Sequence, residues 1–252
     1  MNGYFLCNES QFLFPNALSC LGDFLVKLAE NSLFSVNVRD VKTKQYQLSN
    51  AICAGKWGLT PQEMVGLTHY LAMERVPNFS NLKDIFKIID AHEQEAIKNN
   101  QQMDYLLNIL TYDGTVSIQK TVSIPVFGTK KQPIAIASVT YDLTRHAHLL
   151  YLLKIYKSYY PQKQRAEERI SYYLKLTQYL DKPLNSGELK ILLAMTQEYR
   201  AKRLAKVLQL SPKTIAGYIA SLRDKLKPNI DLYSVLSHLR ARQQWQPNHG
   251  IS

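Results

Sequence analysis

A capped turn between two short amphipathic segments, within residues 184–226, constrains the fold of this chain most. Ser211 can accept hydrogen bonds from the free N–H groups at a helix start, and Pro212 fits the first turn because no donor is needed there. The segment after this cap carries apolar residues at i, i+4, i+7 and i+11, which share one helical face. They are Ile215, Ile219, Leu222 and Leu226.

The segment before the cap predicts a shorter helix at about 201–208, with Leu204, Ala205 and Leu208 on its apolar side. A short helix, a tight turn at Gln209–Leu210 and a capped second helix form a helix-turn-helix. This unit places a helix in the major groove of DNA. We therefore expect a DNA-binding domain in the C-terminal part of the chain.

The distribution of charge agrees with this expectation. The chain carries 31 Lys and Arg against 20 Asp and Glu, a net charge of +11. Residues 1–143 hold 12 basic and 13 acidic side chains, so the remaining 19 basic and 7 acidic ones give residues 144–252 a net charge of +12. The excess positive charge indicates an acidic partner, nucleic acid before a membrane surface.

Cysteine usage and hydropathy favour a cytoplasmic protein without a membrane partner. The odd, sparse set Cys7, Cys20 and Cys53 argues against a disulfide framework and fits a reducing compartment. No apolar stretch approaches the roughly 18–20 residues that cross a bilayer. The N-terminal region also lacks a basic leader followed by one long apolar core, so a signal peptide is not expected.

The first part of the chain predicts an α+β domain over residues 32–144, after a partly helical lead-in at 1–31. Phe34, Val36 and Val38 alternate with polar residues, which is typical of a half-buried strand. Helical patterns follow a second strand, and three later strands form an antiparallel meander. The strands are expected at about 34–38, 46–48, 105–111, 116–127 and 134–141, with a turn at Asp113-Gly114.

From about Leu143 the apolar period becomes helical. Large residues three to four apart predict a helix with a short coiled-coil seam, at Leu149, Leu152, Leu153, Tyr156 and Tyr160. Pro161 ends this helix, and a second one is expected at 166–180. The remaining domains are then a helical linker, an all-α four-helix helix-turn-helix domain and a tail, at 145–181, 182–245 and 246–252.

Residues 184–239 resemble the LuxR-type (GerE-like) DNA-binding domain. The positions that keep the spacing of its pattern are Leu184, Glu188, Ile191, Leu192, Lys202, Leu204, Ala205, Leu208, Ser211, Thr214, Ile215, Lys225 and Leu226. The chain departs from the pattern where Gly187 replaces the usual Arg and Tyr218 the usual His. Ala216, Gly217 and Ala220 stand where this family often carries basic or branched DNA-reading side chains.

Residues of about 33–144 resemble a PAS sensory domain. Residues 112–144 are similar to the last three strands of that family and its closing D-I-T, and residues 56–68 to its G-Y-S-x-E-E-x-x-G segment. The two resemblances together imply a signal-responsive transcription regulator. A PAS-like sensor would control a LuxR-type output domain that binds double-stranded DNA.

Two sets of residues are candidates for DNA contact. Basic side chains are expected to supply most of the affinity through phosphates, and they are Arg200, Lys202, Arg203, Lys206, Lys213 and Lys225. Other candidates start or line the second helix, namely Ser211, Thr214, Gly217, Tyr218, Ala220 and Ser221. The outward face of this helix is small and nearly neutral, so dimer geometry or DNA shape is expected to contribute to sequence discrimination.

The last helix predicts a homodimer. Its apolar stripe consists of Leu232, Val235, Leu236 and Leu239. Such a stripe can also pack inside its own domain, but the last helix of LuxR-type domains forms their dimer, and the coiled-coil seam would support the same interface.

Three residues are candidates for ligand contact in the PAS-like domain. Trp57 can line a pocket, although a large aromatic is more often core. His69 stands where flavin-binding light sensors of this family carry a reactive cysteine, and His92 lies in the helix that holds the iron ligand of heme-binding members. Neither flavin nor heme is expected, because the cysteine is missing and the register around His92 does not match. No metal site is expected.

No catalytic signature is visible, so we do not expect an enzyme. One alternative is a quorum-sensing receptor for acyl-homoserine lactones. Such receptors keep a Trp with a Tyr four residues later, whereas Trp57 is followed at that distance by Pro61. The other alternative is a protein-interaction adaptor with a degenerate helix-turn-helix, which the plain face at Gly217 and Ala220 suggests.

Overall fold

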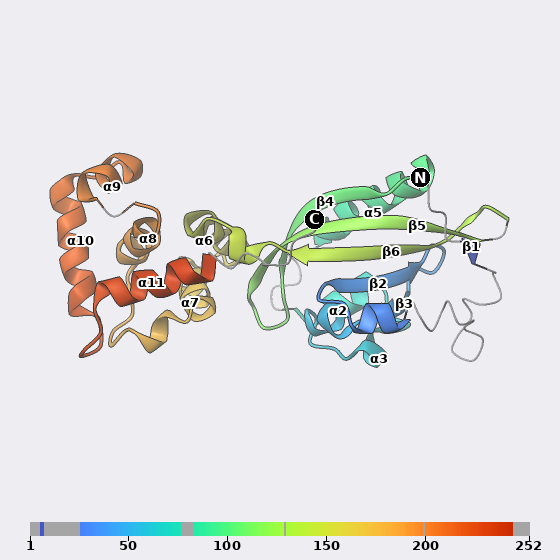
Figure 1. Cartoon of the computed structure of the whole chain (residues 1–252), viewed down its shortest axis with the longest axis horizontal. Coiled ribbons are helices and arrows are strands. Elements are labelled where there is room, and N and C mark those ends of the chain that lie inside the picture. Colours follow the sequence, from blue (N-terminus) through green and yellow to red (C-terminus); the bar gives the residue numbers. More distant parts are fainter. Residues whose placement is uncertain (1–5, 8–25, 77–82, 129, 199, 244–252) are drawn as a thin grey trace. The chain divides into compact units, whose positions relative to one another are not determined.

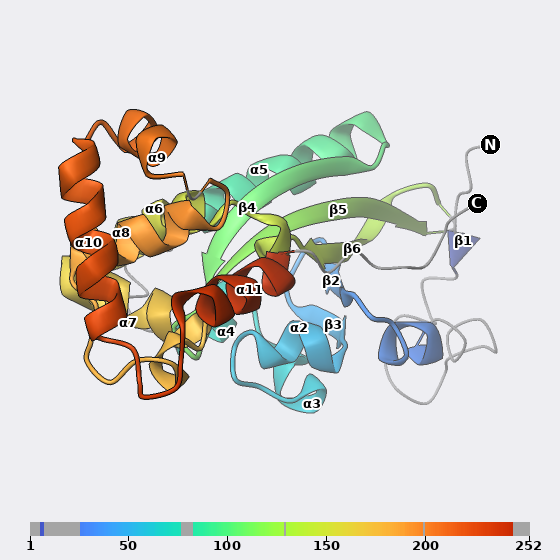
Figure 2. The same cartoon turned by 60° about the vertical axis from the view of Figure 1, so that its left-hand side comes forward.

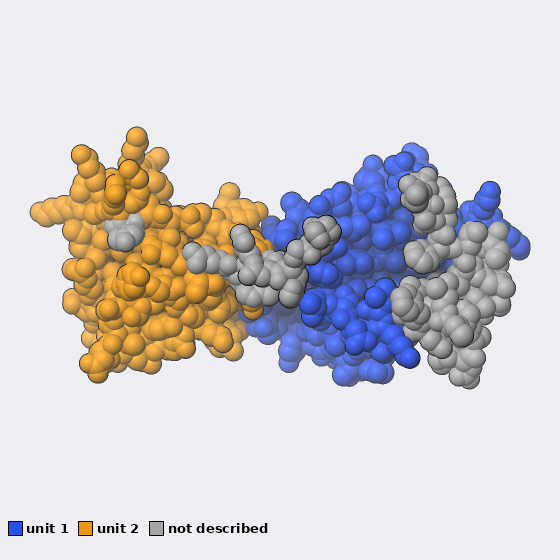
Figure 3. Space-filling model, viewed as in Figure 1, with its two compact units in different colours: residues 1–143 blue, residues 144–252 orange. Residues whose placement is uncertain are grey.

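The structure is a computed structural model that describes residues 6–7, 26–76, 83–128, 130–198 and 200–243 (Figure 1). The chain divides into two compact units, residues 1–143 and 144–252 (Figure 3). Most of the expected lead-in and the whole expected tail lie outside the described residues. The α+β class is confirmed, with an antiparallel sheet and helices in the first unit and helices alone in the second.

The first unit is built on one sheet whose long strands pair antiparallel in the order β3-β2-β6-β5-β4. These strands are β2 (Ser35–Asp40), β3 (Tyr46–Ser49), β4 (Met103–Leu110), β5 (Val116–Gly128) and β6 (Pro133–Asp142). A short β1 (Leu6–Cys7) pairs parallel with the end of β5. The predicted strands and the turn at Asp113-Gly114, where Gly114 has φ +78°, are confirmed.

In the described part of the chain, four helices lie between β3 and β4. They are α2 (Ala51–Gly55), α3 (Pro61–Met64), α4 (His69–Met73) and α5 (Lys83–Asn99). Three of them, α2, α3 and α5, contact the strands of the sheet (Figure 1). Side chains cap the three short ones. Asn50 accepts the N–H of Cys53, and Thr60 forms a reciprocal capping box with Glu63. The caps hold these short helices in place where propensity alone would not.

The buried side of β2 is polar, contrary to the expectation for this strand. Ser35, Asn37 and Arg39 are buried, while Val36 and Val38 are only half-buried. The same holds for β5 and β6, whose buried polar residues are Ser117, Gln119, Thr121, Ser123, Ser138 and Thr140. The two-residue period was predicted correctly, but the assignment of faces was wrong. Arg39 forms a buried ion pair with Glu93 of α5, which directs the polar side of β2 toward the helices.

The second unit consists of helices packed around α8 (Figure 2). They are η3 (Thr144–His146), α6 (Leu149–Tyr159), α7 (Lys163–Tyr173), η4 (Leu176–Gln178), α8 (Ser186–Met195), α9 (Ala201–Leu208), α10 (Pro212–Asp224) and α11 (Leu232–Gln243). Most residues of α8 are buried, including its apolar residues from Ile191 to Met195, while Lys190 is exposed. Arg240 of α11 donates to the carbonyls of Met195 and Thr196, which closes the C-terminus of α8.

The segment interpreted as a linker lies inside this second unit. Residues that were expected to form a coiled-coil seam are buried in the core of the unit, where α6 contacts α7 and α8. The second helix of the segment is also shorter than predicted, because Lys175 adopts a left-handed conformation with φ 55° and interrupts it. α6 and α7 thus pack on α8, and α8 in turn packs on the two helices of the helix-turn-helix. No helix of the described residues is long and apolar enough to cross a membrane.

Candidate nucleic-acid interface and ligand cavity

The predicted helix-turn-helix is formed by α9 and α10. Gln209 ends α9 with φ 55°, and the N–H of Leu210 donates to the carbonyl of Ala205 at 2.9 Å. The hydroxyl of Ser211 then accepts the N–H of Thr214 at 3.0 Å, and Pro212 occupies the first position of α10. These local bonds fix the turn between the two helices, as the sequence predicted.

Most of the candidate DNA contacts lie on the exposed surface of α9 and α10. The exposed ones are Arg200, Lys202, Arg203, Lys206, Ser211, Lys213, Thr214, Gly217 and Ala220. Arg203 is bound to Glu198 through a salt bridge of 3.0 Å, but Lys202, Lys206 and Lys213 have no partner among the residues that the structure describes. This surface is therefore basic and largely uncompensated.

Three other candidates are directed toward α8 instead. The hydroxyl of Ser221 donates to Glu188 at 2.6 Å, and the ammonium of Lys225 donates to Glu188 at 2.6 Å and to the carbonyl of Pro183 at 3.0 Å. The ring of Tyr218 lies against Gly187, where an added Cβ would be 2.4 Å from the Tyr218 hydroxyl. The two departures from the LuxR-type pattern, Gly187 and Tyr218, thus accommodate each other.

Glu188 is the centre of the contact between α8 and α10. Its carboxylate is buried, and it also accepts the N–H of Asn185 at 2.7 Å. Burial raises the pKa of this carboxyl, but the hydrogen bonds from Lys225, Ser221 and Asn185 outweigh burial and hold the pKa below its ordinary value of 4.5. The ionised form of Glu188 therefore stabilises the packing of α10 on α8.

Acid is expected to destabilise the second unit through Glu188. A carboxyl whose pKa is lower in the folded state stabilises it above the unfolded pKa and loses this contribution as pH falls through the folded pKa. The free energy of unfolding should therefore decrease as the pH drops below 4.5. Urea titrations of the full chain at several pH values measure this, and Glu188→Gln should flatten the decrease. Glu168→Gln on α7, an exposed position, is the control; equal acid sensitivity of both variants would contradict the prediction.

The candidate dimer residues are buried within their own unit. Leu232, Val235, Leu236 and Leu239 are at most 9% exposed, in contact with the rest of the second unit. On the outer side of α11, Tyr233 is 68% exposed. A dimer through α11 would have to use this outer side, so the predicted interface stays a prediction.

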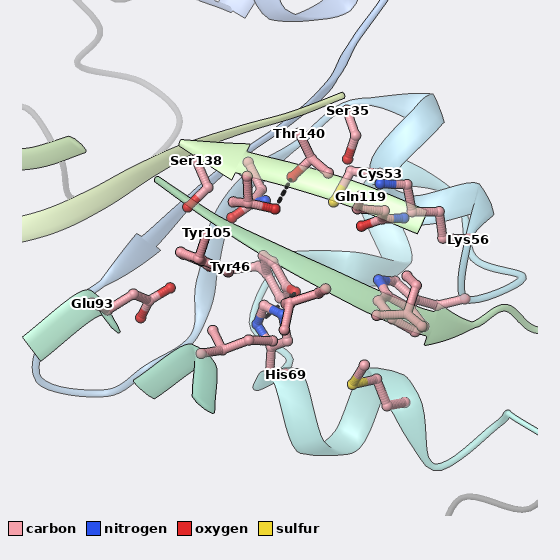
Figure 4. Close-up of a pocket in the computed structure, with 17 residues that line it drawn as sticks. Ser35, Tyr46, Cys53, Lys56, His69, Glu93, Tyr105, Gln119, Ser138 and Thr140 are labelled. Carbon is pink, nitrogen blue, oxygen red and sulfur yellow. Dashed lines mark hydrogen bonds between the residues drawn. The ribbon is translucent and has the colours of Figure 1, made fainter. Parts of the chain in front are cut away.

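A cavity of about 40 Å³ lies in the first unit, between the polar face of the sheet and the helices (Figure 4). The strands contribute the polar residues Ser35, Asn37, Gln119, Thr121, Ser138 and Thr140 and the aromatic and apolar residues Tyr46, Tyr105, Leu107 and Ile109. The helices and their ends contribute Cys53, Lys56, Trp57, His69, Met73 and Glu93. Trp57 and His69 were predicted as ligand contacts and both line this cavity. His92 does not line it; the ring of His92 stacks on Tyr105 at 4.6 Å.

His69 is held in a neutral state at the wall of the cavity. The Tyr46 hydroxyl lies 2.8 Å from its Nδ1 (Figure 4). Burial, followed by the positive charges of Arg39 and Lys56, keeps the pKa of His69 well below 6.5. A second cavity of about 250 Å³ shares His69 and Ile89 with the first one, so these two side chains separate the cavities.

Among the described residues, several buried polar atoms have no hydrogen-bond partner, and two of them lie on β2. These two are Oδ1 of Asn37, which belongs to the lining, and Nε of Arg39. Buried polar atoms in proteins almost always have a partner, so an acceptor left open at a cavity wall indicates a bound molecule or water. Within the described part of the chain, no group of three or more His, Cys, Asp or Glu residues could hold a metal ion.

Sequence reasoning missed Asn37 and Lys56. Asn37 lies on a strand that was predicted, but its polar side was assigned to solvent, and Lys56 follows α2, a helix that was not predicted. The signal that could have found Asn37 is the run of polar residues at alternate positions of β5 and β6. An antiparallel sheet commonly buries the apolar side of its strands, so polar residues that share one side of neighbouring strands are unusual.

No protein-family model matches the chain, and no curated protein matches it. Among solved structures it is similar to a Vibrio cholera VqmA–ligand–DNA complex, at 17% identity and a TM-score of 0.48, over 91% of this chain and 89% of that one. It is also similar to the Vibrio cholerae VqmA dimer, described as a LuxR-type receptor, at 14% identity and a TM-score of 0.40, over 89% and 90% of the two chains.

The PAS domain of Bordetella pertussis BvgS is similar at 18% identity and a TM-score of 0.42, over 54% of this chain and 96% of that one. All three TM-scores lie below 0.5, so the function of this chain has to follow from its own residues. Over most of its length the chain is similar to solved structures of a LuxR-type regulator, and over about half of its length to a PAS domain.

Proposed function

We propose that the protein is a transcription regulator that binds double-stranded DNA through α9 and α10 under the control of a small molecule bound in the first unit. The exposed, uncompensated lysines of the helix-turn-helix are the observation that carries the DNA part. Lys202, Lys206 and Lys213 have no carboxylate partner among the described residues, whereas Lys225 is bound internally. Lysines left free on a helix-turn-helix surface are suited to phosphates.

The chain path supports a regulatory link between the two units. Ser138 and Thr140 of β6 line the cavity, and β6 ends at Asp142. Thr144, two residues further on, begins the second unit. A ligand that moved β6 would therefore also move the segment that leads into the DNA-binding unit. Binding of the ligand could in this way change the populations of the conformations of that unit.

Binding of the full chain to DNA tests the proposal. Fluorescence anisotropy with a labelled duplex of mixed sequence is measured at increasing salt. If about four to six phosphates are contacted, the logarithm of the affinity should fall with the logarithm of the salt concentration with a slope of roughly −4 to −5. Absence of binding at low salt would overturn the proposal and favour the protein-interaction adaptor.

The cavity does not favour a quorum-sensing receptor for acyl-homoserine lactones. Such a ligand needs a channel long enough for its acyl chain, whereas this cavity has a volume of only about 40 Å³. If the protein acts as a homodimer, its two α10 helices would bind half-sites about one helical turn apart, roughly 34 Å. Sedimentation with and without DNA would measure that state.

A further inference from the structure

The lining of the cavity in the first unit includes a lysine that forms no salt bridge or hydrogen bond with a described residue, although the carboxylate of Asp142 acts on it from a longer distance. Lys56 follows α2 and is half-buried at the wall (Figure 4). Its ammonium makes no salt bridge or hydrogen bond within the described ranges. The other charged lining residue, Glu93, is neutralised by Arg39. Burial lowers the pKa of Lys56, and Asp142 only partly offsets this effect, so an anion bound at this side of the cavity would stabilise the ammonium further.

The surroundings of His69 agree with a positive cavity. Burial is the largest effect that disfavours protonation of His69, and the positive charges of Arg39 and Lys56 add to it. His69 thus adds no charge of its own and offers a hydrogen bond from a neutral ring. A neutral ligand would leave the charge of Lys56 without a partner, whereas an anion would compensate it.

The open acceptor lies on the strand side of the same cavity. Asn37 is 6% exposed, and its Oδ1 has no donor. Ser138 is the neighbour of Asn37 on β6, and its hydroxyl is already hydrogen-bonded to Ser123 of β5. A ligand that satisfies Asn37 must therefore carry an O–H or N–H donor in addition to any anionic group.

The size of the cavity limits the ligand. Room for a water molecule is about 10–15 Å³ on this scale, so about 40 Å³ corresponds to about three waters. A molecule of roughly five or six non-hydrogen atoms can replace them. Larger molecules would require His69 or Ile89 to move toward the second cavity.

We infer that the cavity binds a small 2-hydroxy carboxylate, whose carboxylate pairs with Lys56 and whose hydroxyl donates to Oδ1 of Asn37. This inference rests on the proposed function, because it names the chemical class of the controlling ligand. It predicts discrimination between an acid and its uncharged amide, which share size and shape.

Glycolate and lactate, compared with glycolamide and lactamide, test the inference on the full chain near neutral pH. Isothermal titration and the shift of the melting temperature are measured with each probe at up to about 10 mM, where millimolar ligands saturate. The acids should bind at least about tenfold more tightly than the amides. Equal binding of acids and amides, or no binding of either acid, would overturn the inference.

Variants separate a specific site from a general charge effect. Lys56→Met keeps the apolar stem and should remove acid binding without unfolding the unit, and Lys56→Arg should retain it. Lys42→Met, at an exposed lysine of the same unit, is the control and should bind like the natural chain. Acid binding that survives Lys56→Met would overturn the inference. If the natural chain binds the acids but does not bind DNA, the result contradicts the proposed function and does not contradict the assignment of the ligand.

Discussion

Replacing Lys202 and Lys213 with glutamate is expected to weaken DNA binding by about a hundredfold or more near 0.1 M salt. Both lysines are exposed on the helix-turn-helix, one on α9 and one in the first turn of α10. Each substitution removes a phosphate contact and places a negative charge next to the DNA backbone. The slope of affinity against salt should also become shallower by about two, as measured by anisotropy titrations at several salt concentrations.

A matched pair of substitutions controls for net charge. Lys154 and Lys163 are exposed on α6 and α7 of the same unit, and their replacement by glutamate changes the total charge equally. This control should lose less than about threefold in affinity, because charges beyond a Debye length of the DNA are screened. Equal losses in the two variants would mean that the helix-turn-helix surface is not the interface.

The helix-turn-helix could be predicted closely because its signals are local. A left-handed residue at Gln209, a cap at Ser211 and a proline at the next position act within a few residues of chain. The boundaries of α9 therefore coincide with the expected 201–208. Local signals of this kind do not depend on what packs against the helix, so a single sequence is sufficient.

The roles of side chains on α10 could not be predicted in the same way. A helical wheel shows which residues share a face, but Ser221, Lys225 and Tyr218 are directed inward by residues of α8 that lie about 30 to 40 positions earlier. Glu188 accepts the hydrogen bonds that direct Ser221 and Lys225 inward. No sequence pattern near Glu188 indicates that it accepts hydrogen bonds from another helix. These three candidates therefore contact α8, and their contact with DNA stays a prediction.

The polar interior of the first unit shows the same limit for strands. Alternation fixes which residues of β2 share a face, but the choice of the buried face depends on the helices. Glu93 of α5 follows Arg39 by 54 positions and pairs with it inside the unit. Hydrophobicity alone favours burial of Val36 and Val38, and the ion pair overrides that preference.

The Arg39–Glu93 pair gives the second large effect that we expect. Arg39→Met alone should lower the free energy of unfolding of the first unit by about 3–5 kcal/mol, because it leaves the Glu93 carboxylate buried without its partner. Burial already raises the pKa of Glu93, and removal of Arg39 should raise it further. The double variant Arg39→Met/Glu93→Leu should regain most of the loss, since two apolar side chains need no counter-charge.

Urea unfolding of the full chain measures these changes through Trp57, which is buried in the first unit. A Trp245→Phe background leaves Trp57 as the sole tryptophan, because the chain contains two. This selectivity matters because two units need not unfold in one step. Lys87→Met, which removes an exposed ion pair with Asp84, is the control and should cost less than about 1 kcal/mol. A double variant as unstable as Arg39→Met alone would contradict the expectation, since the loss would then come from packing and not from an unpaired charge.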